Sequence, residues 1–175
     1  MTEVISYQKY NIQELVDLGS SILIRKADIL DLDRLRDLWI EQRNYHHDLD
    51  SLYAYTEESP QKWVEQIDNM LHSKFQCVYV AVNSQGHILG YIHGGIYPWP
   101  ISPYEYYGSL NTVSVTQEAR GQGIGKRLIM KLLDWFKDQG IEQVSLHVDY
   151  RNQRALELYY SLGFRSYQHR LILSL

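Results

Sequence analysis

The pattern of hydrophobic and polar positions divides the chain into alternating short strands and amphipathic helices. Apolar residues that alternate with polar ones, or that form β-rich runs, predict strands over residues 22–27, 76–82, 87–96, 110–115, 143–148 and 166–173. Apolar residues spaced by three and four predict helices over residues 28–39, 60–71, 126–137 and 152–163. Helices and strands are therefore interspersed along the whole sequence.

Glycine, proline and short polar residues mark the boundaries between these elements. Gly140 and Gly163 mark the C-terminal ends of two predicted helices, where glycine is common. Residues 83–86 predict a hairpin turn, and three prolines predict a loop over residues 97–107 that is dense in aromatic side chains. Residues 43–58 are rich in acids and aromatics and have little periodicity, which favours either a solvated loop or a binding wall.

The most distinctive stretch is a predicted strand, a glycine-rich turn and a helix, in that order. Glycines stand at positions 121, 123 and 125, directly before the apolar pattern of the helix. The first N–H groups of a helix have no partner within it, and the helix dipole adds positive potential there. Such a turn is typical of a phosphate-binding site, although a tight turn that needs glycine for its backbone is the simpler alternative.

Two common phosphate-binding motifs do not fit this turn. The P-loop requires glycine where Arg120 stands and serine or threonine where Arg127 stands. The dinucleotide fingerprint Gly-x-Gly-x-x-Gly also fails, because its third glycine is missing in either register. A nucleotide-binding protein is therefore disfavoured. The pattern that does fit is Arg-x-x-Gly-x-Gly, formed by Arg120, Gly123 and Gly125.

A second motif lies downstream and reads Asn-x-x-Ala-x-x-Leu-Tyr-x-x-x-Gly-Phe, from Asn152 to Phe164. Together the two motifs resemble the hallmarks of the GCN5-related N-acetyltransferase (GNAT) family, which uses acetyl-CoA. The resemblance covers residues 22–175. It implies an α/β (α+β), three-layer acyl-CoA N-acyltransferase fold with a mixed, largely antiparallel central sheet flanked by helices. It also implies one domain over residues 22–175, preceded by an N-terminal extension over residues 1–21.

The resemblance further implies which residues bind the cofactor. The motif strand would hold the pantetheine arm through its backbone, the glycine turn would hold the pyrophosphate, and Asn152 would contact the arm. The residues assigned in this way are Val113, Ser114, Val115, Arg120, Gly121, Gln122, Gly123, Ile124, Gly125, Lys126, Asn152 and Tyr159.

The same resemblance assigns the catalytic acid, whereas the base rests on a weaker inference. Tyr159 matches the family's tyrosine and would protonate the leaving sulfur, its ordinary pKa being about 10. The alternative is a core tyrosine on the apolar face of its helix. Residues 110–115 contain no acid, so Glu105 is our hypothesis for the base, with His93 and His147 as further candidates. Alternatively, Glu105 is a surface charge, and water or the free amine suffices.

Composition narrows the class of protein. The 175 residues are 45% hydrophobic, which suits one globular domain, and a net charge of −4 argues against a general nucleic-acid binder. Cys77 is the only cysteine, so neither an intrachain disulfide nor a cysteine-based zinc site is expected. We expect no metal. No signal peptide is visible and no apolar run approaches the ~20 residues that span a bilayer, so we expect a cytoplasmic protein without membrane contact.

We therefore expect an N-acetyltransferase that moves an acetyl group from acetyl-CoA to a primary amine of a small molecule. No suitably placed nucleophile is evident, which favours direct attack in a ternary complex. The acids and tyrosines of residues 43–58 suit an ammonium acceptor. A non-catalytic acyl-CoA-binding or regulatory module and a protein N-acetyltransferase stay open as alternatives, as does a homodimer.

Overall fold

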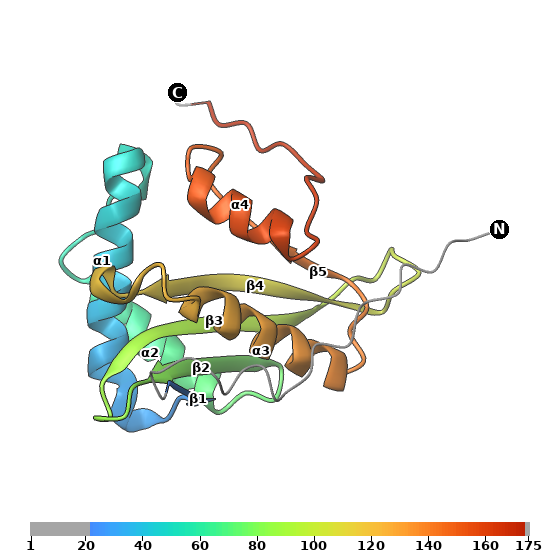
Figure 1. The fold of residues 1–175 in the computed structure, drawn as a ribbon. Coiled ribbons are helices and arrows are strands. Elements are labelled where there is room, and N and C mark those ends of the chain that lie inside the picture. Colours follow the sequence, from blue (N-terminus) through green and yellow to red (C-terminus); the bar gives the residue numbers. More distant parts are fainter. Residues whose placement is uncertain (1–21, 174–175) are drawn as a thin grey trace.

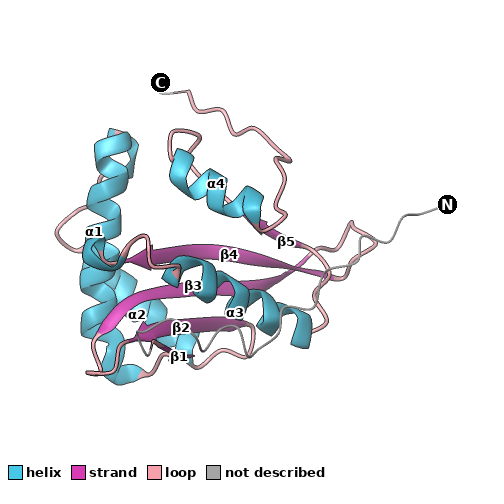
Figure 2. Ribbon diagram, viewed as in Figure 1, coloured by secondary structure: helices cyan, strands magenta, loops and turns pink. Residues whose placement is uncertain are grey.

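A computed structural model describes residues 22–173, which form a five-stranded sheet with helices on both faces (Figures 1 and 2). The strands lie side by side in chain order: β1 (Leu23–Lys26), β2 (Gln76–Val82), β3 (Ile88–Pro98), β4 (Tyr106–Val115) and β5 (Val144–Leu146). Neighbours from β1 to β4 are antiparallel, and β5 runs parallel to β4. The expected mixed, largely antiparallel sheet is confirmed.

Helices form the two outer layers. They are α1 (Leu32–Leu49) and α2 (Ser59–Leu71) on one face, and α3 (Ile124–Asp138) and α4 (Gln153–Ser161) on the other. Short 3-10 turns complete the chain: η2 (Ile29–Asp31), η3 (Ser51–Tyr53) and η4 (Gln117–Ala119). Within residues 22–173, none of the helices has the length and apolar character needed to cross a membrane.

The sheet separates two hydrophobic cores. Because successive strand residues point to opposite faces, the neighbours Tyr91 and Ile92 belong to different cores, and both are fully buried. The core under α1 and α2 contains Leu35, Leu38, Ile67, Val78, Val80, Val82, Ile88 and Tyr91. The larger core under α3 and α4 includes Cys77, Ile92, Leu128, Ile129, Leu132, Phe136 and Tyr159.

An irregularity in β4 determines the shape of the sheet's far edge. Pairing with β3 shifts between His93–Thr112 and Gly94–Leu110, so Asn111 is an extra residue in a β-bulge. Beyond the bulge β4 continues to Val115, but β5 pairs only with Gly108 to Leu110. Residues 111–115 of β4 therefore have an edge that β5 does not cover, called here the unpaired edge.

Three expectations from the sequence need correction. Helix α1 continues through residues 43–49, which were expected to be irregular. Apolar periodicity fails there because this end of α1 extends past the sheet and has no core beneath it (Figure 1). The loop between β3 and β4 is shorter than predicted, since β3 reaches Pro98 and β4 starts at Tyr106.

The third correction concerns the predicted last strand over residues 166–173. This segment forms no strand, and Leu171 is 92% exposed. Alternating apolar residues favour a strand only where a partner edge accepts them, and the described part of the chain supplies no such pairing. The predicted N-terminal extension, residues 1–21, lies outside the described residues.

Leu132→Ala tests the packing between α3 and the sheet. The Leu132 side chain is fully buried, and a Cβ added to Gly94 would come within 2.7 Å of it. We expect the free energy of unfolding to fall by about 2–5 kcal/mol, because truncation leaves a cavity in a close-packed core. The measurement is urea denaturation. The control is Leu30→Ala, at a side chain 89% exposed, which should change the free energy of unfolding by less than ~0.5 kcal/mol. An equal loss of stability in the two variants would contradict this packing.

Candidate functional site

The glycine turn adopts the backbone geometry of an uncapped helix N-terminus. Gly121 and Gly123 have positive φ angles of 84° and 74°, which glycine accepts without strain. Gly123 is the N-cap of α3, and no side chain caps the helix. The Arg127 N–H donates to the Gly123 carbonyl at 3.0 Å and is the first to make a helical hydrogen bond. The N–H groups from Ile124 to Lys126 therefore have no carbonyl partner within the helix.

The space in front of this turn suits a phosphate group. A Cβ added to Gly123 would meet nothing within 4 Å, and Lys126 is exposed. The Arg120 side chain turns back toward the strand, where its Nε donates to the Val115 carbonyl at 3.1 Å. The Arg120 guanidinium also lies 5.5 Å from the centre of the Tyr45 ring on α1. Arg120 thus holds the turn against β4 and α1.

The unpaired edge of β4 leads directly into this turn. The Thr116 N–H donates to the Leu89 carbonyl of β3, and alternation therefore directs the backbone groups of Val113 and Val115 to the opposite edge. There the Val113 carbonyl accepts a hydrogen bond from Gln42 Nε2 at 3.2 Å, and the Val115 carbonyl accepts one from Arg120. The N–H groups of the two valines point the same way, in position to bind an extended ligand.

Ser114 differs from its two neighbours in orientation. Its hydroxyl donates to the Leu38 carbonyl on α1 at 3.4 Å, and its side chain is buried. Alternation directs its backbone groups toward β3. The structure therefore places Ser114 beneath α1, on the side of β4 away from the unpaired edge.

The second motif forms α4, which packs beside the same edge. The Asn152 side chain accepts a hydrogen bond from the Ala155 N–H at 3.2 Å, so Asn152 is the N-cap of α4, a position where asparagine is favoured. Tyr159 is only 7% exposed and packs with its ring centre 5.8 Å from that of Phe164, in the core that also contacts Val113 and Val115. Burial raises the pKa of Tyr159 to about 12, so its phenol stays protonated at neutral pH.

The candidate bases lie in three different places. Glu105 is exposed in the turn before β4, roughly 20 Å along the strand from Thr112. His93 is buried opposite Thr112, with Nε2 2.8 Å from Gln76 Oε1, and burial lowers its pKa to about 4. His147 is exposed just after β5. The structure therefore brings the glycine turn, the unpaired edge and Tyr159 together, but it does not bring Glu105 to them.

An ion-paired cluster that sequence reasoning missed joins the segment after α1 to the segment before α4. Arg151 NH2 lies 2.7 Å from Asp149 Oδ2 and 2.9 Å from Asp50 Oδ2, and the Tyr53 hydroxyl donates to Asp149 at 3.2 Å. The Asp149 side chain is 7% exposed, and hydrogen bonds from Arg151 hold the pKa of that carboxyl far below its usual range. In the sequence Asp149 and Arg151 stand directly before the second motif, but nothing near them indicates that Arg151 pairs with Asp50, 101 positions away.

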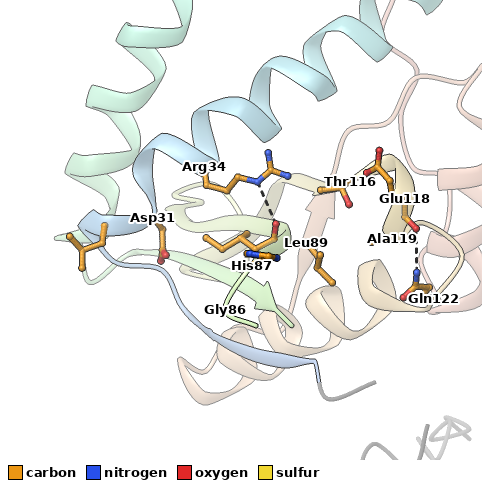
Figure 3. Close-up of a pocket in the computed structure, with 11 residues that line it drawn as sticks. Asp31, Arg34, Gly86, His87, Leu89, Thr116, Glu118, Ala119 and Gln122 are labelled. Atoms are coloured by element: carbon orange, nitrogen blue, oxygen red, sulfur yellow. Dashed lines mark hydrogen bonds between the residues drawn. The ribbon is translucent and has the colours of Figure 1, made fainter. Parts of the chain in front are cut away.

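A separate groove of about 680 Å³ opens between the start of α1, the β2–β3 turn and η4 (Figure 3). Arg34 on its wall donates to the Ile88 carbonyl at 3.4 Å, and Gln122 donates to the Glu118 carbonyl at 3.3 Å. Gln122 is the one residue that this groove shares with those assigned from the sequence.

Comparison with known proteins identifies the family. The profile of the acetyltransferase (GNAT) family matches residues 32–164, and the chain belongs to this family of acyltransferases. A mycothiol acetyltransferase from Paenarthrobacter aurescens is 39% identical over 85 residues, which are 49% of this chain and 26% of that protein. The uncharacterized N-acetyltransferase YobR from Bacillus subtilis is 38% identical over 64 residues, 37% of this chain and 26% of that protein. The chain thus matches about a quarter of the length of these relatives.

Solved structures share the fold at lower sequence identity. A Bacillus halodurans protein superposes with a TM-score of 0.78 at 22% identity, covering 87% of this chain and 99% of that one. A predicted acetyltransferase from Clostridium acetobutylicum, solved with acetyl-CoA, has a TM-score of 0.70 at 17% identity over 87% and 96% of the two chains. An aminoglycoside N-acetyltransferase in complex with CoA has a TM-score of 0.68 at 17% identity over 91% and 97%. The fold expected from the sequence is thereby confirmed.

Asp149→Asn tests the ion-paired cluster through the pH dependence of stability. The folded-state pKa of Asp149 lies below the unfolded value of about 3.9, so its pairing stabilises the folded protein above that pH and is lost as the pH falls. We expect the variant to melt at a lower temperature than the wild type near pH 7, with a difference that narrows below about pH 4. Thermal denaturation across this range measures it.

The matched control for this prediction is Asp33→Asn, which removes an exposed ion pair with Arg36. We expect the control to melt close to the wild type at every pH. A melting difference for Asp149→Asn that stayed constant down to the most acidic pH would contradict the assigned role of the carboxylate.

Proposed function

We propose that this chain transfers an acetyl group from acetyl-CoA to a primary amine of a small molecule. The observation that carries the proposal is the junction of β4 and α3, where an uncapped glycine turn continues the unpaired strand edge. Mycothiol acetyltransferase and aminoglycoside N-acetyltransferase, the names of a relative and a structural neighbour, describe enzymes with small-molecule acceptors. We further propose that residues 22–175 act as one domain, which the extent of the family match supports.

In this proposal the backbone does most of the cofactor binding. Acetyl-CoA, when bound, supplies the acetyl group as a thioester. The N–H groups from Gly121 to Lys126 bind the pyrophosphate, with Gly121, Gln122, Gly123, Ile124 and Gly125 shaping the turn. The Arg120 N–H, which the sequence also assigned to this role, already donates to the Gln117 carbonyl at 3.3 Å. The N–H groups of Val113 and Val115 bind the arm, and Asn152 fixes the start of α4 beside it. Ser114 supports the strand from beneath rather than through its own side chain.

In this proposal Tyr159 is the proton donor to the leaving sulfur. A bond forms between the amine nitrogen and the carbonyl carbon, the carbon–sulfur bond breaks, the nitrogen loses a proton and the sulfur gains one. The raised pKa of Tyr159 keeps its hydroxyl protonated at neutral pH, so the hydroxyl can donate that proton to sulfur. Solvent then restores the phenol. Attack is direct, in a ternary complex, because Cys77 is buried and Ser114 lies under α1.

The proton on the amine has two routes. The sequence hypothesis gives it to Glu105, but this carboxylate is exposed at the opposite end of β4 from the glycine turn. We therefore favour reaction of the free-base form of the amine, with release of its proton to water. This route places no acid on β4, in agreement with residues 106–115, which contain neither aspartate nor glutamate.

Thermal melting with CoA tests the phosphate-binding turn. A ligand at 100 times its Kd adds about 2.7 kcal/mol, so acetyl-CoA and CoA should raise the melting temperature by several degrees, whereas ATP and NAD should not. We expect Gly123→Ala to lose most of this increase, because alanine strains the positive φ at the N-cap. Gly86→Ala, at a φ of 85° in the β2–β3 turn, is the matched control and should keep it. An equal increase in melting temperature with CoA in both variants would contradict phosphate binding by the glycine turn.

Tyr159→Phe tests the catalytic acid and separates an enzyme from a non-catalytic acyl-CoA-binding module. We expect kcat to fall by about 10²- to 10⁴-fold with the KM for acetyl-CoA little changed, because only the proton donor is removed. Release of thiol with a panel of amines measures both parameters. The control is Tyr160→Phe, which removes an exposed hydroxyl that contacts Ser166. A wild type that binds CoA but acetylates no amine would favour the module.

A further inference from the structure

The β3–β4 hairpin carries a continuous row of four aromatic rings. The ring centres of Tyr97 and Tyr107 are 5.8 Å apart, those of Tyr107 and Trp99 are 5.6 Å apart, and those of Trp99 and Tyr104 are 6.2 Å apart. All four side chains are half-buried, so each has a surface open to solvent. We call Tyr97, Trp99, Tyr104 and Tyr107 the aromatic row.

One end of the aromatic row lies where the unpaired edge of β4 begins. Asn111, the extra residue of the bulge, donates from Nδ2 to the Tyr97 hydroxyl at 3.1 Å. Its neighbour Leu110 is the last residue of β4 that pairs with β5. Under the proposed function, this is where the thioester would lie, because the arm would occupy the edge just beyond. The first ring is therefore next to the reacting group.

The aromatic row and the helix that carries the glycine turn lie on opposite faces of the sheet. Tyr97 lies an even number of positions after Tyr91 in β3 and therefore shares its face of the sheet, the face covered by α1 and α2. Ile92 and Leu110, in contrast, pack beneath α3 on the other face. Tyr107 pairs with Tyr97 and shares its face. An acceptor lying on the row thus reaches the edge from the side away from α3.

An acidic residue lies at the other end of the aromatic row. The backbone N–H of Trp99 donates to the backbone carbonyl of Glu105 at 2.8 Å, so the backbone of Glu105 lies next to Trp99, and Tyr104 is its neighbour in the chain. Glu105 is exposed and is the only charged residue between Trp99 and Tyr107. The faces of aromatic rings attract cations, and a nearby carboxylate adds to that attraction. The far end of the row is therefore suited to an ammonium group.

We propose that the aromatic row and Glu105 form the acceptor subsite for an amine that carries a second positive charge remote from the reacting nitrogen. This inference rests on the proposed function and specifies its substrate class. Along β4 the rise from Asn111 to Tyr107 is roughly 13 Å, so the second charge is several bonds from the first. Linear polyamines and polycationic aminosugars share this chemistry. Glu105 then anchors the substrate and does not remove its proton.

Kinetics on the full chain test the subsite with two amines of equal length that can span ~13 Å, 1,10-diaminodecane and 10-amino-1-decanol. We expect the wild type to prefer the diamine by about tenfold in kcat/KM. Trp99→Ala should raise the KM for the diamine by about fivefold to tenfold and raise the KM for the amino alcohol less, because only the diamine places a second charge on that ring. Glu105→Gln should also raise the KM for the diamine. Its rate should still rise with increasing pH, as expected when the free-base form of the amine reacts. Spermidine and kanamycin distinguish linear from sugar acceptors.

Each of the two variants has a matched control. Tyr106 is the exposed strand neighbour of Tyr107 and points to the other face by alternation, so Tyr106→Ala should leave the preference intact. Glu142→Gln removes an exposed carboxylate outside the hairpin and should also have no effect. An equal rate with both amines, or equal effects of Tyr106→Ala and Trp99→Ala, would overturn the subsite. A flattened pH profile in Glu105→Gln would also overturn it, by returning that residue to the role of base.

Calorimetric titration with spermidine distinguishes failure of the subsite from failure of the proposed function. Binding that Trp99→Ala and Glu105→Gln weaken, in a protein that acetylates no amine, would support the subsite and refute the transferase. Acetylation of amines without any dependence of spermidine binding on these two residues would support the transferase and refute the subsite.

Discussion

The parallel pairing of β4 with β5 stops after Leu110 and Leu146, and the rest of the site is arranged around that interruption. The bulge at Asn111 changes which residues of β4 face β3, so the backbone groups of Val113 and Val115 turn to the uncovered side. A strand that paired along its full length would use these groups in the sheet. Here their N–H groups remain available, and the strand is followed by η4, the glycine turn and the uncapped start of α3.

Such an edge requires support from outside the sheet, because unsatisfied backbone groups are costly when they are shielded from water. Side chains supply part of it: Gln42 and Arg120 each donate to a carbonyl of the edge. Separately, the cluster of Arg151, Asp149 and Asp50 ties the end of α1 to the loop before α4. These contacts explain why α1 extends past the sheet without apolar residues to bury. Its last turns are held by polar contacts and not by a core.

The two sides of the site differ in how far the sequence could predict them. The glycine turn was predictable because helix N-terminal N–H groups and positive φ angles are local properties of a short segment, and Gly121 and Gly123 adopt those angles. The cap by Asn152 was predictable for the same reason. The aromatic row was not, because it depends on side chains that meet across strands. Glu105 was chosen for its proximity in sequence to the motif strand, but an extended strand carries it away from the glycine turn.

The sequence by itself determined the motifs that mark the family, most of the helices and strands, and the glycine turn, since each depends on residues within about a dozen positions of one another. Tertiary structure decided where α1 ends, that residues 166–173 form no strand, that Arg151 joins Asp149 to Asp50, and that four aromatic rings form one row. The physical reason is the same in each case. Strand pairing, ion pairs and ring contacts form only when a partner is present, and the fold alone brings that partner near.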